Sequence, residues 1–141
     1  MLAGLLFVWI TGMRVKSILT ALALIALPAG AAASGFVYNA DTWLALPPQA
    51  RQAYAQGIND AANYIYVTDD VGAAVVKFAR TRCLIEQKTT AAILADRITM
   101  AYTTEPVFKS VPPNIVYFAK MAVYCRDIIA QERDRMGLPP G

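Results

Sequence analysis

The chain has 141 residues, 57% of them hydrophobic and 16% charged, with 13 basic and 10 acidic side chains, two cysteines and no histidine. The lack of histidine excludes Ser-His-Asp and Cys-His catalysis, and two cysteines alone cannot complete a structural zinc site. We therefore expect a protein that is not an enzyme and uses no metal or cofactor, with the length of a single domain.

Residues 1–33 are typical of a secretory signal peptide. Read from Met13, they comprise a basic segment, an apolar run and a small-residue cleavage site, at residues 14–16, 18–27 and 31–33. We interpret residues 1–12 as an upstream extension of a product that starts at Met13, and a retained membrane anchor is the alternative. Cleavage after Ala33 predicts a periplasmic domain of residues 34–141.

Prolines divide this domain into segments, and the pattern predicts an all-α fold of three to four helices. After a short turn that begins at Asp41, helices are expected over residues 47–66, 71–83, 89–105 and 111–137. Strand or irregular structure is the alternative for residues 71–83, which contain Gly72 and two adjacent valines. The charged C-terminal tail, residues 126–141, is expected to be solvated.

Three of these helices carry an apolar stripe at helical spacing, which we expect to face the core. The first stripe consists of Ala50, Ala53, Tyr54, Gly57, Ile58, Ala61, Tyr64 and Ile65. The second consists of Ile93, Leu94, Ile98, Ala101 and Tyr102, and the third of Ile115, Phe118, Ala119, Ala122, Val123 and Ile129.

Export places Cys83 and Cys125 in an oxidising compartment, where a disulfide between them is favoured over free thiols or a redox pair. Removal of the leader takes away two basic residues and no acid, so the net charge falls from +3 to +1. That charge argues against nucleic-acid binding. We also expect no small-molecule substrate and no membrane contact after cleavage.

Loops at helix ends are the expected contacts for a protein partner. These are Thr68, Asp69 and Asp70 before the second long helix, and Glu86 and Lys88 in the polar link that follows it. Tyrosine combines an apolar ring with a polar tip, so Tyr64, Tyr66 and Tyr117 are further candidates, with core packing as the alternative.

Four stretches of the chain are similar to the Tai-type (Rap-type) immunity proteins: YAQGINDAANYI, CLIEQKTTAAILADRI, AYTTEP and VPPNIVYFAKMAVYC. The matching positions are Gly57, Asp60, Ala61, Cys83, Leu84, Glu86, Thr89, Tyr102, Pro106 and Cys125, within residues 42–126. The resemblance implies a small exported helical protein, often a homodimer, that binds a secreted peptidoglycan-hydrolase toxin of the amidase type and occludes its active site.

A second hypothesis is a periplasmic acid-stress chaperone, which is also small, helical and held by one disulfide, and which has no toxin partner. Such a protein exposes apolar surface once its acids are neutralised. The ten acidic residues here are scattered along the sequence, so we rank this hypothesis below the immunity protein.

Overall fold

The computed structural model describes residues 36–139, and this part of the chain is all-helical, with no strand. It contains α2 (Ala40–Leu44), α3 (Pro48–Asn63), α4 (Val71–Glu86), α5 (Ala91–Thr104), the 3-10 turn η1 (Pro106–Phe108), α6 (Pro113–Tyr124) and α7 (Arg126–Arg135). The predicted all-α class is confirmed, although six α-helices occur here in place of three to four. The predicted signal peptide lies outside the described residues.

Five of the described helices, α2 to α6, begin at a residue suited to that position. Pro48 and Pro113 occupy the first turns of α3 and α6, where a missing N–H costs nothing. Asp70 accepts a hydrogen bond from the Ala73 amide at 2.7 Å and caps α4, so residues 71–83 are helical. The short turn expected to begin at Asp41 is a helix, capped by Asn39.

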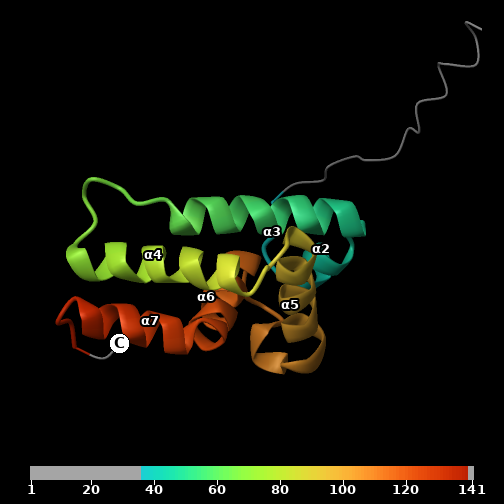
Figure 1. The fold of residues 1–141 in the computed structure, drawn as a ribbon. Helices are drawn as coiled ribbons and strands as arrows, with labels where there is room; N and C mark the ends of the chain where they lie inside the picture. The colour runs from blue at the N-terminus through green and yellow to red at the C-terminus, as the bar shows by residue number, and fades with distance from the viewer. Residues whose placement is uncertain (1–35, 140–141) are drawn as a thin grey trace, which may run out of the picture. The chain divides into compact units, whose positions relative to one another are not determined.

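The C-terminal part differs from the single solvated helix expected over residues 111–137. The helix breaks at Cys125, whose φ of −104° and ψ of 10° end α6 before α7 begins. In Figure 1, α7 lies alongside α4, and Glu132 of α7 is only 6% exposed. The charged tail is therefore partly packed because the break turns α7 back onto α4.

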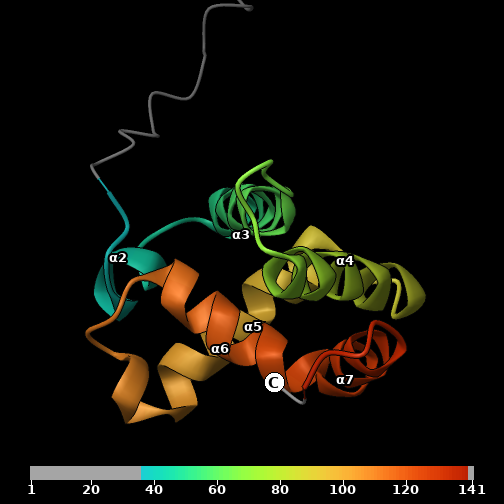
Figure 2. The ribbon, with the colours of Figure 1, turned by 90° about the vertical axis from the view of Figure 1, so that its left-hand side faces the viewer.

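Helices α3, α4 and α7 lie side by side in Figure 1, with α5 crossing near one end of the group. Figure 2 views these three nearly along their axes and shows α6 running across them, with α2 beyond α6. The closest packing is between α4 and α7, between α3 and α5, and between α5 and α6. None of the described helices is long and apolar enough to cross a membrane.

Large side chains from three helices, α2, α5 and α6, fill the core, namely Trp43, Ile98, Tyr102, Val116, Tyr117 and Met121. Their polar tips are satisfied: the Trp43 indole donates to Thr99 at 2.9 Å and the Tyr102 hydroxyl donates to the Val111 carbonyl at 2.8 Å. Burial raises the pKa of Tyr102 to about 12. The hydroxyl therefore stays protonated and available as a donor at neutral pH.

The predicted disulfide is confirmed and lies at the centre of the domain. Cys83 and Cys125 are bonded, with Cα atoms 5.7 Å apart, and both are almost fully buried. Cys83 lies inside α4, which continues to Glu86, whereas the sequence pattern predicted a helix that ends at Cys83. The bond ties α4 to the junction of α6 and α7, and it is compatible with an exported protein.

Two of the predicted apolar stripes do not face the core. In α3, Gly57 and Ala61 are exposed, and the buried residues are Ala55 and Ala62. The α5 stripe is confirmed apart from Ile93, which is exposed. In α6 the buried residues are Pro113, Val116, Tyr117 and Met121, whereas Ile115, Phe118, Ala122 and Val123 are exposed. Both helices are rotated about their axes relative to the predicted orientation, because Tyr117 of α6 bonds to the polar side of α3, as described below.

Candidate functional site

Asp69, one of the predicted contact residues, is engaged within its own loop. Its carboxylate accepts a hydrogen bond from the Tyr66 amide at 2.8 Å and pairs with Lys77 at 2.7 Å. The hydrogen bond from Lys77, followed by that from the Tyr66 backbone, lowers the pKa of Asp69 below its ordinary 3.8. Asp69 therefore holds the loop of residues 64–70 in shape.

The other two predicted contact residues of this loop, Thr68 and Asp70, differ in whether their side chains are already bonded. Thr68 is exposed, and no side-chain hydrogen bond involves it in the described structure. Asp70 is exposed too, but one of its oxygens caps α4. Of the three predicted contact residues here, Thr68 is thus the one whose side chain makes no hydrogen bond to the described residues.

Glu86 and Lys88 lie at the opposite end of α4 from the loop. The helix has 16 residues, which at the usual rise per residue separates its ends by about 24 Å. Glu86 pairs with Arg82 at 2.6 Å, and Lys88 is exposed with a φ of 50°, in the left-handed region. The five predicted contact residues therefore form two separate places, and a single small epitope cannot include both.

An apolar hollow lies beside the loop, and the sequence analysis missed it. The hollow has a volume of about 400 Å³, and its apolar lining consists of Ile65, Val71, Ala74, Val75, Phe78 and Met136. Four of these side chains, Ile65, Val71, Phe78 and Met136, are between 49% and 59% exposed. Clustered exposed apolar side chains of this kind mark interaction sites on protein surfaces. The sequence pattern placed Tyr64 and Ile65 on a helix over residues 47–66, but α3 ends at Asn63, so the apolar run of residues 64–67 lies in the loop.

Aromatic side chains rigidify the same loop. The rings of Tyr64 and Tyr66 meet edge to face with centroids 4.8 Å apart, and the Lys77 ammonium lies 4.8 Å from the Tyr66 centroid. Both tyrosines are more than half exposed, as expected for contact residues, but Tyr117 is fully buried. Its proposed role as a surface contact is therefore wrong, and core packing is the correct alternative.

Salt bridges hold the side of the apolar hollow that α7 forms. Glu132 of α7 binds Arg82 of α4 and Arg135 of its own helix. Burial on its own raises the pKa of Glu132, but the hydrogen bonds from Arg135 and Arg82 outweigh it, so the pKa lies below its ordinary value. The bridge to Arg82 holds the two helices that frame the hollow.

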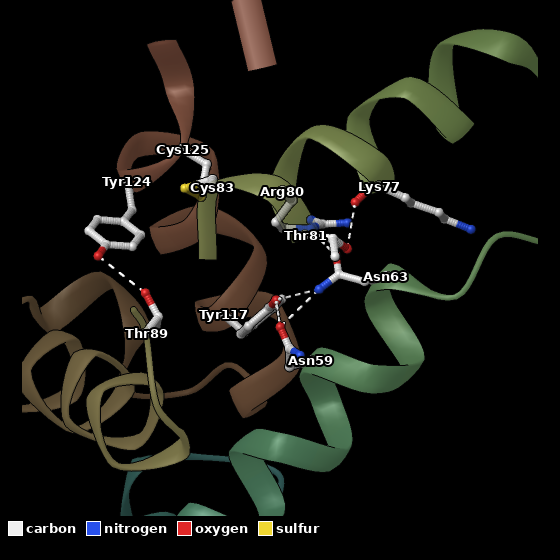
Figure 3. Close-up of a disulfide and its surroundings, with 10 residues drawn as sticks. All are labelled: Asn59, Asn63, Lys77, Arg80, Thr81, Cys83, Thr89, Tyr117, Tyr124 and Cys125. Carbon is white, nitrogen blue, oxygen red and sulfur yellow. Dashed lines mark hydrogen bonds between the residues drawn. A yellow bond between two sulfur atoms is a disulfide. The ribbon is translucent and has the colours of Figure 1, made fainter. Parts of the chain in front are cut away.

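A polar network lies beneath α3, close to the disulfide (Figure 3). The Tyr117 hydroxyl donates to the Asn59 side chain at 2.8 Å, and Asn63 contacts the same hydroxyl at 3.4 Å. Arg80 donates to Asn63 at 2.6 Å and to the Ala62 carbonyl at 2.9 Å. Burial raises the pKa of Tyr117 and lowers that of Arg80, because it disfavours the charged form of each.

Chemically, the surface offers recognition groups: aromatic rings, apolar side chains and paired charges. No three side chains of the metal-ligating types come together within residues 36–139. Comparisons of the chain with protein-family models, with curated proteins and with solved structures found no match.

Proposed function

We propose that the chain is a periplasmic protein of the immunity type, which binds a peptidoglycan-hydrolase toxin of the amidase class and occludes it, and which is not itself an enzyme. The observation that carries this proposal is the apolar hollow beside residues 64–70. A core of exposed apolar and aromatic side chains with a polar rim is the usual anatomy of a protein interface. The resemblance to the Tai-type family supplies the class of partner.

The contact is expected to centre on Phe78 and Val71. They lie next to the rigid loop, so a partner loses little freedom by packing against them, and a rigid site binds more tightly than one that must be ordered first. Thr68 and Asp70 would then form part of the polar rim. Glu86 and Lys88, about 24 Å away by the length of α4, would contact the same toxin only across a large interface.

The test is inhibition of a purified peptidoglycan amidase from the same genomic neighbourhood, measured by release of cleaved peptides, with complex formation followed by size-exclusion chromatography and light scattering. Light scattering also reports whether the free chain is a homodimer. Failure to inhibit or bind any such amidase would reject the proposal. Suppression of aggregation of a client protein at about pH 2–3 would then favour the chaperone hypothesis.

Matched variants locate the interface. Val71→Asp places a charge in the apolar hollow, whereas Val107→Asp makes the same change at an exposed valine of η1. Loss of a central contact costs about 2 kcal/mol, so Val71→Asp should weaken inhibition about 30-fold. Val107→Asp should inhibit normally. Equal inhibition by the two variants would remove the apolar hollow from the interface.

A further inference from the structure

A second surface lies on the side of the domain where α3 meets α6. A shallow groove of about 490 Å³, here called the α3–α6 groove, is lined by Tyr54, Gly57, Ile58, Ala61, Ala62, Asn114 and Phe118. The lining is mainly apolar, and small residues of α3 form part of it. Phe118 is 41% exposed and also lines a neighbouring hollow of about 570 Å³, so the two adjoin at this side chain.

This neighbouring hollow, here called the cationic pocket, has an excess of positive charge. Its charged lining consists of Lys77, Arg80, Arg133 and a single acid, Asp70. Lys77 is paired with Asp69, but no salt bridge joins Arg80 or Arg133 to an acid within the described part of the chain. The pocket thus presents two cations that form no salt bridge with the described residues, with Asp70 as the one acid in its lining.

Arg80 is the unusual member, because it is a cation that is only 6% exposed. Its Nε and Nη2 atoms donate to neutral oxygens of α3, and Nη1 makes no hydrogen bond to any of residues 36–139. The rings of Phe118 and Tyr117 lie 5.2 and 5.9 Å from the guanidinium carbon. Burial of a cation without an opposite charge is unfavourable, and a carboxylate on the open donor would relieve it with a charge-assisted hydrogen bond.

We propose that the α3–α6 groove and the cationic pocket together bind an extended segment of a partner protein, with an apolar side chain in the groove and an aspartate or glutamate on Arg80. Arg133 adds a second positive charge at the mouth of the pocket. The apolar groove selects for a side chain and the cationic pocket for its acidic neighbour, so the charge complementarity defines the partner. This inference rests on the proposed protein-binding function and specifies the chemistry of one partner segment.

The test uses capped peptides with a leucine and a glutamate separated by no, one or two alanines, and the same peptides with glutamine in place of glutamate. Each peptide is titrated into isotope-labelled protein of residues 34–141 while its amide resonances are followed by NMR. At least one glutamate peptide should shift the amides around Phe118 and Ala73, and its glutamine counterpart should bind about 10-fold more weakly. Added salt should weaken the glutamate peptide only.

Charge variants provide the second arm of the test. Arg133→Glu should weaken the glutamate peptide about 10-fold, whereas Arg126→Glu, at an arginine of the same helix outside the pocket, should leave it unchanged. Arg80→Lys keeps the charge but loses the planar donor set, and it should also weaken binding. Thermal melts of each variant check that it is folded.

Three results would overturn the inference: no binding by any peptide, equal binding of glutamate and glutamine peptides, or equal effects of Arg133→Glu and Arg126→Glu. These results are separable from the fate of the proposed function. Peptides that fail while the amidase is still inhibited would remove the groove and leave the immunity role. Selective peptide binding without any amidase partner would do the reverse.

Discussion

Loss of the Cys83–Cys125 disulfide should remove a large part of the stability of the domain. The bond closes a loop with a sequence separation of 42, and the chain-entropy model assigns such a loop about 4 kcal/mol. Domains of this size are stable by about 5–15 kcal/mol in total. The double variant Cys83→Ala/Cys125→Ala should therefore melt about 15–30 °C lower than the oxidised protein.

The assay is urea unfolding followed by circular dichroism. With a typical slope of about 2 kcal/mol per molar, the midpoint should fall by about 2 M in the double variant. The single variant Cys125→Ala keeps the Cys83 thiol but opens the same loop, so it should agree with the double variant within about 1 kcal/mol.

A double variant that unfolds within about 1 kcal/mol of the oxidised protein would refute this reasoning. It would mean that the contacts between α7 and α4, including the bridge from Glu132 to Arg82, persist in part in the unfolded chain. The two ends of the loop would then stay close without the disulfide. A single variant much less stable than the double one would instead indicate that the lone buried thiol is the problem, and the loop would not be the cause.

Three further changes test other parts of the structure. Tyr117→Phe should lower the free energy of unfolding by about 1 kcal/mol in urea, because the half-buried amides of Asn59 and Asn63 lose the hydroxyl and keep only their bonds to each other and to Arg80. The exposed Tyr64→Phe should cost nothing. The pKa of Asp69 is lowered in the folded state, so its contribution to the free energy of unfolding is present above about pH 4 and is lost as the pH falls further. The difference in free energy of unfolding between wild type and Asp69→Asn should therefore shrink at about pH 2.5. A difference that stays constant with pH would contradict this. Lys88→Gly should have a free energy of unfolding about 1 kcal/mol higher than Lys88→Ala, because φ is 50° there and glycine adopts the left-handed region without strain. Equal free energies of unfolding for the two variants would show that the residue is not strained.

Local sequence signals were enough to predict where helices begin. Proline in a first turn and a side chain that accepts the first free amides act within a few residues, so α3, α4, α5 and α6 start close to their predicted positions. The disulfide was predicted from the expected export of the chain and from its two cysteines. These features do not depend on how the helices pack.

The orientation of two helices could not be predicted in the same way. Apolar residues occur all around α6, so periodicity alone does not choose between Phe118 and Tyr117 for the core. Asn59 and Asn63 look like surface residues in the sequence, yet they turn inward because Tyr117 and Arg80 need polar partners. Such partners, more than 15 residues apart, become visible only in the fold.

The candidate surfaces were predicted only in part. Thr68, Asp69 and Asp70 were predicted as contact residues, but the two acids serve the loop and the start of α4, and apolar side chains from α4 and α7 form much of the neighbouring hollow. Those helices meet because the chain bends at Cys125, and no glycine or proline at that position announces the bend.

The attachment of α3 to the rest of the molecule has a consequence for its motions. Only Ala55 and Ala62 of this helix are buried, so its detachment exposes little apolar area, whereas α5 buries Leu94, Ile98 and Tyr102 among others. The hydrogen bonds from Tyr117 and Arg80 keep α3 in one register while it is in place, but a helix that contributes few fully buried side chains opens at a lower free energy than its neighbours. Brief excursions of α3 would leave the remaining helices and their disulfide intact, and amide exchange would be fastest along this edge of the domain.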